Sequence, residues 1–140
     1  MDPNNQNNQN DQNNFQNAAA NFTNMPDSTS QFDPADIQAN KTMGILAYIG
    51  FLVLVPIFSA KESRFAKFHA NQGLALFIVE LAIGVLNTIS WYIPLIGGII
   101  RIVLSLVSLA VLIVAIMGIL AASKGEAKKM PIIGNITILK

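Results

Sequence analysis

A few polar side chains lie inside the apolar sequence of this chain, and they are the residues that could do chemistry. The stretch RFAKFHANQGLALFIVE, residues 64–80, carries the only histidine, His69, and a carboxylate, Glu80. Steps of three and four residues from His69 along a helix reach Gln72, Glu80 and Asn87, so these side chains share one face. A carboxylate in apolar surroundings has to be paired, neutral or hydrated, because an isolated charge is costly there.

Two interpretations of Glu80 remain open in the sequence. Arg101, Ser105 and Ser108 share a face of the following apolar segment. If both helices meet the membrane boundary at the turn between them, Glu80 lies about 15 Å deep and Arg101 about 9 Å deep, a difference that an arginine side chain covers. The structural interpretation is therefore a Glu80–Arg101 pair inside the bundle. The functional alternative is a polar, water-accessible groove for protons, ions or a passing polar segment.

The start of the same helix combines aromatic, basic and amide side chains. A lone histidine with no second ligand nearby is expected to be a hydrogen-bonded residue at the helix start rather than a metal ligand. The basic, amphipathic loop before it suits the headgroup region and anionic lipid. Ordinary basic flanking of a membrane helix explains the loop equally well. The helix-start motif consists of Phe68, His69, Asn71, Gln72 and Gly73, and the basic loop contains Lys61, Arg64 and Lys67.

Enzyme signatures are missing from the sequence. The chain has one histidine, no cysteine and a single acid, Glu80, within its apolar segments. This composition excludes an aspartyl pair, a HExxH zinc site and a Cys–His centre, and the GxxxxGK phosphate loop does not occur either. We expect no catalysis, no cofactor or metal, and no nucleic-acid partner.

Three apolar segments are long enough to hold these side chains in a membrane. The chain is 52% hydrophobic and only 12% charged, which is too apolar for an ordinary soluble domain. The segments run over about residues 43–60, 72–92 and 95–122, and the shortest already spans roughly 27 Å as a helix. We predict an all-α integral membrane protein with three transmembrane helices. A four-helix arrangement is the alternative, although residues 95–122 are too short for two spans of about 20 residues each and a turn.

Residues 1–40 differ sharply in composition from the rest of the chain. They hold 11 Asn, 6 Gln and five Asp but no Lys or Arg, so their formal charge is −5, against +6 for residues 41–140. Such an amide-rich segment buries too little apolar surface to offset the entropy lost on ordering. We predict a disordered Asn/Gln-rich tail, followed by a helical membrane domain over residues 41–140.

The basic residues predict how this domain lies in the cell membrane. With three spans, the basic loop and the C-terminal segment 123–140 lie on the same face and carry seven of the nine basic residues. The positive-inside rule makes this face cytoplasmic and leaves the tail outside. The closing PIIGNITILK, residues 131–140, is expected to form an interfacial extended segment that packs back on the bundle. Small residues in the spans favour close helix packing, so a homo-oligomer or other membrane proteins are expected as partners beside the lipid bilayer.

Two stretches carry a resemblance to a known family. AYIGFLVLVPIFSAKESRFAKFHANQGLALFIVE, residues 47–80, together with the closing PIIGNITILK, resembles small bacterial membrane proteins of a domain-of-unknown-function family. That family is related to the chloroplast inner-envelope import component of the Tic (twenty-kilodalton) type. The resemblance implies an α-helical membrane domain over about residues 41–140 and a part in protein transport.

Three functional hypotheses follow from these observations. The leading one is a protein translocation or membrane-assembly component. A proton- or ion-coupled transporter or channel that uses Glu80 is the first alternative. A structural or lipid-interacting membrane protein, driven by the basic loop, is the second.

Overall fold

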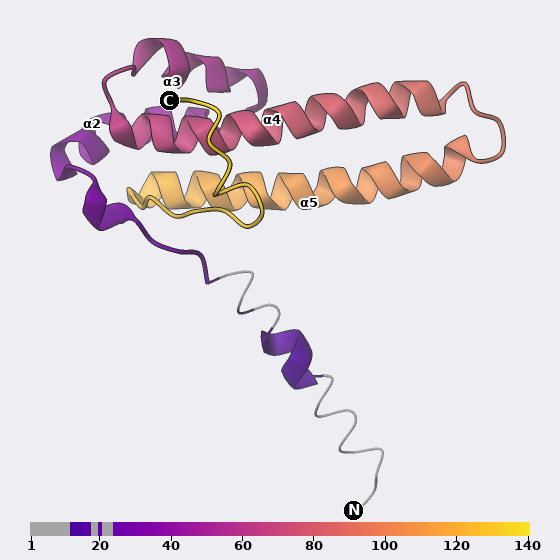
Figure 1. Cartoon of the computed structure of the whole chain (residues 1–140), viewed down its shortest axis with the longest axis horizontal. Coiled ribbons are helices and arrows are strands. Elements are labelled where there is room, and N and C mark those ends of the chain that lie inside the picture. The colour runs from indigo at the N-terminus through magenta and orange to yellow at the C-terminus, as the bar shows by residue number, and fades with distance from the viewer. Residues whose placement is uncertain (1–11, 18–19, 21–23) are drawn as a thin grey trace, which may run out of the picture.

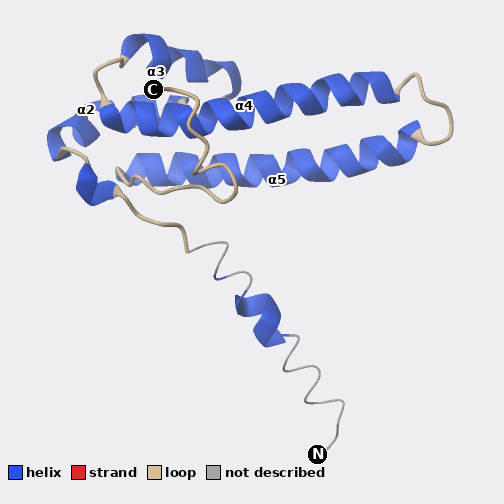
Figure 2. Ribbon diagram, viewed as in Figure 1, coloured by secondary structure: helices blue, strands red, loops and turns tan. Residues whose placement is uncertain are grey.

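A computed structural model of the chain describes residues 12–17, 20 and 24–140. Within these residues the regular elements are helices (Figure 2). Residues 12–17 are helical, and the elements that follow are η1 (Thr29–Gln31), α2 (Pro34–Leu46), η2 (Gly50–Val53), α3 (Leu54–Ser59), α4 (Arg64–Ser90) and α5 (Gly97–Lys124). The predicted all-α class is confirmed for the described part of the chain.

Helices α4 and α5 form a long antiparallel hairpin (Figure 1). With 27 and 28 residues they are each about 40 Å long, and both are apolar enough to cross a membrane. Large apolar side chains such as Leu81, Leu86 and Ile102 are exposed along them. An exposed apolar surface of this length suits contact with lipid tails rather than with water. The second and third predicted segments are thus confirmed as helices of membrane-spanning length.

The predicted first span, residues 43–60, does not exist as one helix. Helix α2 ends at Leu46, and the chain then turns through η2 into the short helix α3. Gly50 lies in this turn with a φ of +50°, a conformation that residues with a β-carbon rarely adopt. Pro56 lies in the first turn of α3, where its missing N–H removes no helical hydrogen bond.

The chain therefore enters the bundle along α2 and returns along α3. The last residues of α3 lie beside the first residues of α2, around a shared surface pocket that includes Asp33, Asp36, Phe58 and Ser59. In the described part of the chain, two helices rather than three have the length needed to cross a membrane.

Residues 24–40 are folded, although a disordered tail was predicted for all of residues 1–40. Asp33 accepts a hydrogen bond from the Ala35 N–H (2.9 Å), and Pro34 occupies the first helical position. This is a favourable helix start, and the predicted boundary at residue 41 falls inside α2. Residues 1–11, 18–19 and 21–23, on which much of that prediction falls, lie outside the described residues.

The segments outside the hairpin gather at one of its ends and form a cap, which we define as residues 24–63 and 125–140 (Figure 1). The cap packs on the first turns of α4 and the last turns of α5. Its larger core cluster contains Ala47, Tyr48, Ala70, Ala75, Leu76, Val114, Ala121, Met130 and Ile133. A smaller cluster contains Ile37, Phe65 and Ala127.

The N-terminal and C-terminal parts of the cap lie side by side. Asp27 and Lys128 form an isolated antiparallel β-bridge, and the Lys129 N–H donates to the carbonyl of Pro26 (3.0 Å). Residues 24–40 thus belong to the same folded unit as the C-terminal segment, from which the predicted first span would have separated them.

Candidate functional site

The amides of the helix-start motif hold the C-terminal segment against α4. Gln72 Oε1 accepts a hydrogen bond from the Met130 N–H (2.6 Å), and Gln72 Nε2 donates to the carbonyl of Lys128 (3.2 Å). Asn71 Oδ1 accepts from two backbone N–H groups (2.5 and 2.9 Å) and Asn71 Nδ2 donates to a carbonyl, all within residues 136–139. Because an amide carries both donors and acceptors, these two side chains satisfy backbone groups of a segment that is not helical.

His69 links the turn after α2 to the C-terminal segment. The side chain is 0% exposed, with Nε2 3.1 Å from the carbonyl of Glu126 and Nδ1 3.0 Å from the hydroxyl of Tyr48. Since a carbonyl only accepts, Nε2 donates and Nδ1 accepts from Tyr48. Phe65 and Phe68 pack edge-on against the imidazole. Both ring nitrogens are therefore used inside the protein, which leaves neither for a metal ion.

Gly73 and Phe68 make the remaining contacts of the motif. A β-carbon at Gly73 would lie 1.8 Å from the carbonyl oxygen of Ala47, in the turn after α2. Phe68 packs edge-on against Phe32, with 5.4 Å between ring centres. The motif thus contacts three parts of the cap: the segment before α2, the turn after α2 and the C-terminal segment.

Asp36 caps the start of α4 from a different helix. Ser63 Oγ, just before α4, accepts from the Ala66 N–H (3.0 Å), and Asp36 Oδ2 accepts from the Phe65 N–H (3.0 Å). The carboxylate also lies at the positive end of the α4 dipole. Burial raises the pKa of Asp36, but hydrogen bonds from Ser63, Phe65 and Asn40 outweigh it, so the net pKa is below the ordinary 3.8.

Charged side chains near the two ends of the chain support the same arrangement. Hydrogen bonds from the hydroxyl and the N–H of Thr29 lower the pKa of Asp27. Lys128 forms an ion pair with Glu126 (2.8 Å), which raises the pKa of Lys128. Both side chains of this ion pair are about 30% exposed, and ion pairs near the surface contribute little stability.

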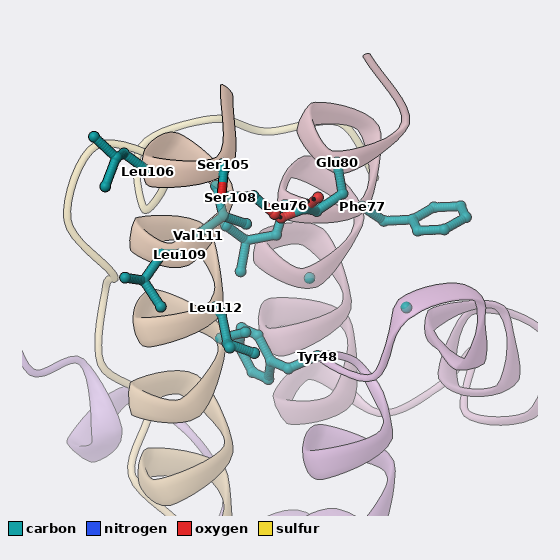
Figure 3. A pocket seen from close by; sticks show the side chains of 13 residues that line it. Tyr48, Leu76, Phe77, Glu80, Ser105, Leu106, Ser108, Leu109, Val111 and Leu112 are labelled. Carbon is teal, nitrogen blue, oxygen red and sulfur yellow. Dashed lines mark hydrogen bonds between the residues drawn. The ribbon is translucent and has the colours of Figure 1, made fainter. Parts of the chain in front are cut away.

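Glu80 lies in a groove between α4 and α5, beyond the cap (Figure 3). Both of its carboxylate oxygens lie within hydrogen-bond distance of the Ser108 hydroxyl, at 2.9 and 3.1 Å. The groove has a volume of about 530 Å³, and Ser105 also lines it. Three polar side chains from two helices therefore meet within an otherwise apolar hairpin.

The predicted Glu80–Arg101 pair is not formed. Arg101 Nη1 donates to the carbonyl of Ser90 (3.2 Å), and its guanidinium stacks over the ring of Trp91 at 4.4 Å. The antiparallel register sets Glu80 level with Ser108, which is about 10 Å farther along α5 than Arg101. The sequence estimate aligned the helices by their ends, and this underestimated the separation of the two charges.

The remaining predicted residues lie on the surface. Asn87 is exposed on α4 and is not part of the groove. The basic-loop residues Lys61, Arg64 and Lys67 are exposed at the cap end of the hairpin. The Arg64 guanidinium lies 6.0 Å from the centre of the Phe32 ring, so this loop contacts the N-terminal part of the cap.

The sequence analysis missed Asp36 and Tyr48. An N-cap aspartate followed by proline, Asp33-Pro34, is a helix-start signal and could have placed Asp36 in a first turn. No comparable signal identifies Tyr48 as the partner of His69, because the turn through η2 brings them together. Within the described residues, no group of three or more His, Cys, Asp or Glu side chains is arranged to hold a metal ion.

The fold and these contacts define a class of protein: a long apolar helical hairpin with a folded cap at one end. The chain belongs to the magnetosome magnetite crystal formation protein family (MamF/MmsF), whose model matches residues 39–137. The matched range covers most of α2, the hairpin and nearly all of the C-terminal segment. No solved structure matches the chain.

Relatives named as membrane or magnetosome proteins share this sequence. The chain is 33% identical over 95 residues to UPF0132 membrane protein MJ1527 of Methanocaldococcus jannaschii, covering 66% of this chain and 64% of that protein. It is 28% identical over 97 residues to magnetosome protein MamF of Paramagnetospirillum magneticum, covering 69% and 81%. Magnetosome protein MmsF of the same organism is 29% identical over 91 residues, covering 65% and 78%. The chain is accordingly a membrane protein.

These relationships correct two predictions from the sequence. The resemblance to Tic-type import components is wrong, because the family that matches is that of magnetosome crystal formation proteins. The translocation function and the protein-transport role that depended on this resemblance are wrong for the same reason. Residues 68–73, which lie within the longer stretch that carried this resemblance, are explained by their contacts with the cap.

Proposed function

We propose that this chain is a membrane protein without catalytic activity that helps to organise a particle-forming membrane compartment, as the description of its family indicates for magnetite crystals. The extent of the family match carries this proposal. Residues 39–137 include the hairpin and most of the cap, so the shared sequence is more than a membrane anchor alone. The hairpin would hold the protein in the membrane, and the cap would present a surface at which other molecules assemble.

The hydrogen bonds made by the polar residues of the cap and of the start of α4 support a role without catalysis. His69, Asn71 and Gln72 are bound to backbone groups of the C-terminal segment, and Asp36 is bound to the start of α4. These polar residues are among those that the sequence or the geometry would single out for chemistry, and they hold the cap together. A stable surface, rather than a reactive centre, follows from this arrangement.

Two crossings of the membrane, with the cap in the cytoplasmic headgroup region, are the topology that we propose. The cap end carries all the basic residues except Arg101, which agrees with the positive-inside rule. Trp91 and Tyr92 are exposed at the opposite end and suit the membrane interface there. A three-span arrangement would require residues 43–60 to straighten, which would break the Tyr48–His69 hydrogen bond.

Complementation tests the proposed function. A strain of Paramagnetospirillum magneticum without its own MmsF would express this chain, and electron microscopy would compare crystal size and number with the deletion strain. We expect crystal size and number to shift toward those of the strain that retains MmsF. The variant His69→Ala, which loosens the cap, is the control and should shift them less. Unchanged crystals, despite localisation of the wild-type chain to the magnetosome membrane, would contradict a part in crystal formation.

A further inference from the structure

The hydrogen bonds of Glu80 in the groove between α4 and α5 join it to Ser108 and not to the cap, so its position needs an explanation other than the stability of the cap. Glu80 lies about 15 Å from the turn end of α4 and about 24 Å from its start, within the apolar part of the hairpin. The Ser108 hydroxyl is the hydrogen-bond donor found at its carboxylate. One hydroxyl does not balance a negative charge in a medium of low polarity, so a cation or a proton has to meet Glu80 there.

The described part of the chain does not supply that cation. Arg101 is engaged with Ser90 and Trp91 near the turn, and Lys67 lies about 20 Å toward the cap. A second copy of the chain, lying parallel to the first in the membrane, would place its own residues of the same depth beside the groove. Those residues are hydroxyl groups and another carboxylate, which supply no positive charge. Charge complementarity therefore favours a cationic ligand over a second copy of the chain.

The residues that line the groove indicate the size and polarity of the ligand. They are mainly apolar, and consist of Tyr48, Leu76, Leu106, Leu109 and Leu112 among others. The volume of about 530 Å³ is typical of a small-molecule site. Figure 3 shows the Glu80 carboxylate turned toward α5, with Tyr48 and Leu112 farther along the groove toward the cap.

The groove is also accessible from the bilayer. Leu106, Leu109 and Leu112 are each more than half exposed, so a molecule dissolved among the lipid tails can approach it from the side. We propose that this groove binds a lipophilic organic cation, whose charge meets Glu80 and whose apolar body lies against the leucines. Ser105 and Ser108 add hydroxyl groups beside the charge.

Equilibrium binding of tetraphenylphosphonium to the full chain in phospholipid nanodiscs tests this proposal. Empty nanodiscs measure partition into lipid, and tetraphenylborate, which has a similar shape and the opposite charge, is the control ligand. We expect saturable binding of the cation only.

Substitutions assign the binding to the groove. Glu80→Gln removes the charge and keeps the size, so we expect affinity to fall by at least about tenfold. Glu62→Gln, which changes an exposed acid in the loop before α4, is the matched control and should bind like the wild type. Leu109→Trp obstructs the groove from an exposed position, and it keeps the test decisive if the Glu80 variant does not fold.

Three results would overturn the proposal. The first is undiminished binding by folded Glu80→Gln or Leu109→Trp protein. The second is the lack of saturable binding by the folded wild type. The third is a wild-type dimer that binds no cation and that Glu80→Gln dissociates, which would make the groove an interface between copies.

Discussion

The carbonyl of Ala47 lies directly against the α-carbon of Gly73, so close that a β-carbon at position 73 would be 1.8 Å from the oxygen. The turn after α2 and the helix α4 therefore pack backbone to backbone. This contact determines where along α4 the chain turns after α2 and continues into η2 and α3. It also explains why the helix-start motif ends in glycine.

Gly73→Ala should destabilise the protein by roughly 2 kcal/mol or more, because the added methyl group forces the turn and the helix apart. Thermal unfolding in detergent, followed by circular dichroism, measures the effect. Gly84→Ala is the matched control on the same helix, since no atom lies within 4 Å of its β-carbon position. That change should be neutral or stabilising by up to about 1 kcal/mol. Equal effects of the two substitutions would contradict the close contact at Gly73.

His69→Ala should cost about 2–4 kcal/mol, because it leaves a cavity and removes the partners of Tyr48 and of the Glu126 carbonyl. Tyr48→Phe removes only one of these hydrogen bonds and should cost about 1–2 kcal/mol. The same unfolding experiment measures both. If His69 binds a metal ion instead, chelators will lower the stability of the wild type, whereas we expect no change.

Asn71→Ala should release the end of the C-terminal segment without unfolding the hairpin. The side chain makes three hydrogen bonds to the backbone of residues 136–139, and no other amide replaces them there. Limited proteolysis with chymotrypsin should cleave after Leu139 faster in this variant than in the wild type. Asn87→Ala, which changes an exposed amide farther along α4, is the control. Equal cleavage of all three proteins would show that other contacts hold the segment.

The two long helices could be predicted from sequence because length and continuous apolarity determine them. The segment 43–60 is equally apolar, but Gly50 introduces a turn whose position depends on packing against Gly73, which is distant in sequence. The partner of Glu80 depends on the register of α4 and α5, and hydropathy does not determine register. The helix start at Asp33 was not predicted, because the amide-rich residues before it made the whole of residues 1–40 look disordered by composition.

Stability should decrease in acid through Asp36. Its pKa is below 3.8 in the folded protein, so the folded state binds the proton less readily than the unfolded state. The stabilisation is then fully present above pH 3.8 and is lost as the pH falls through the folded pKa. Asp36→Asn should lower the free energy of unfolding by about 0.5–2 kcal/mol near neutral pH. It should also reduce the loss of this free energy as the pH falls, measured by thermal unfolding over a range of pH. The control is Glu62→Gln, and a curve for Asp36→Asn parallel to that of the wild type would exclude this role.

Single-cysteine labelling distinguishes the proposed two-span topology from a three-span one. The chain contains no cysteine, so cysteines can be introduced singly at Gln38, Leu95 and Lys140, all of which are exposed. With two spans, positions 38 and 140 lie on one side and position 95 on the other; with three spans, position 38 joins position 95. A membrane-impermeant maleimide on intact cells should label position 95 alone, and permeabilisation should expose the other two. Labelling of position 38 before permeabilisation would contradict the re-entrant path of α2 and α3, since only a straight first span carries Gln38 to the side of the α4–α5 turn.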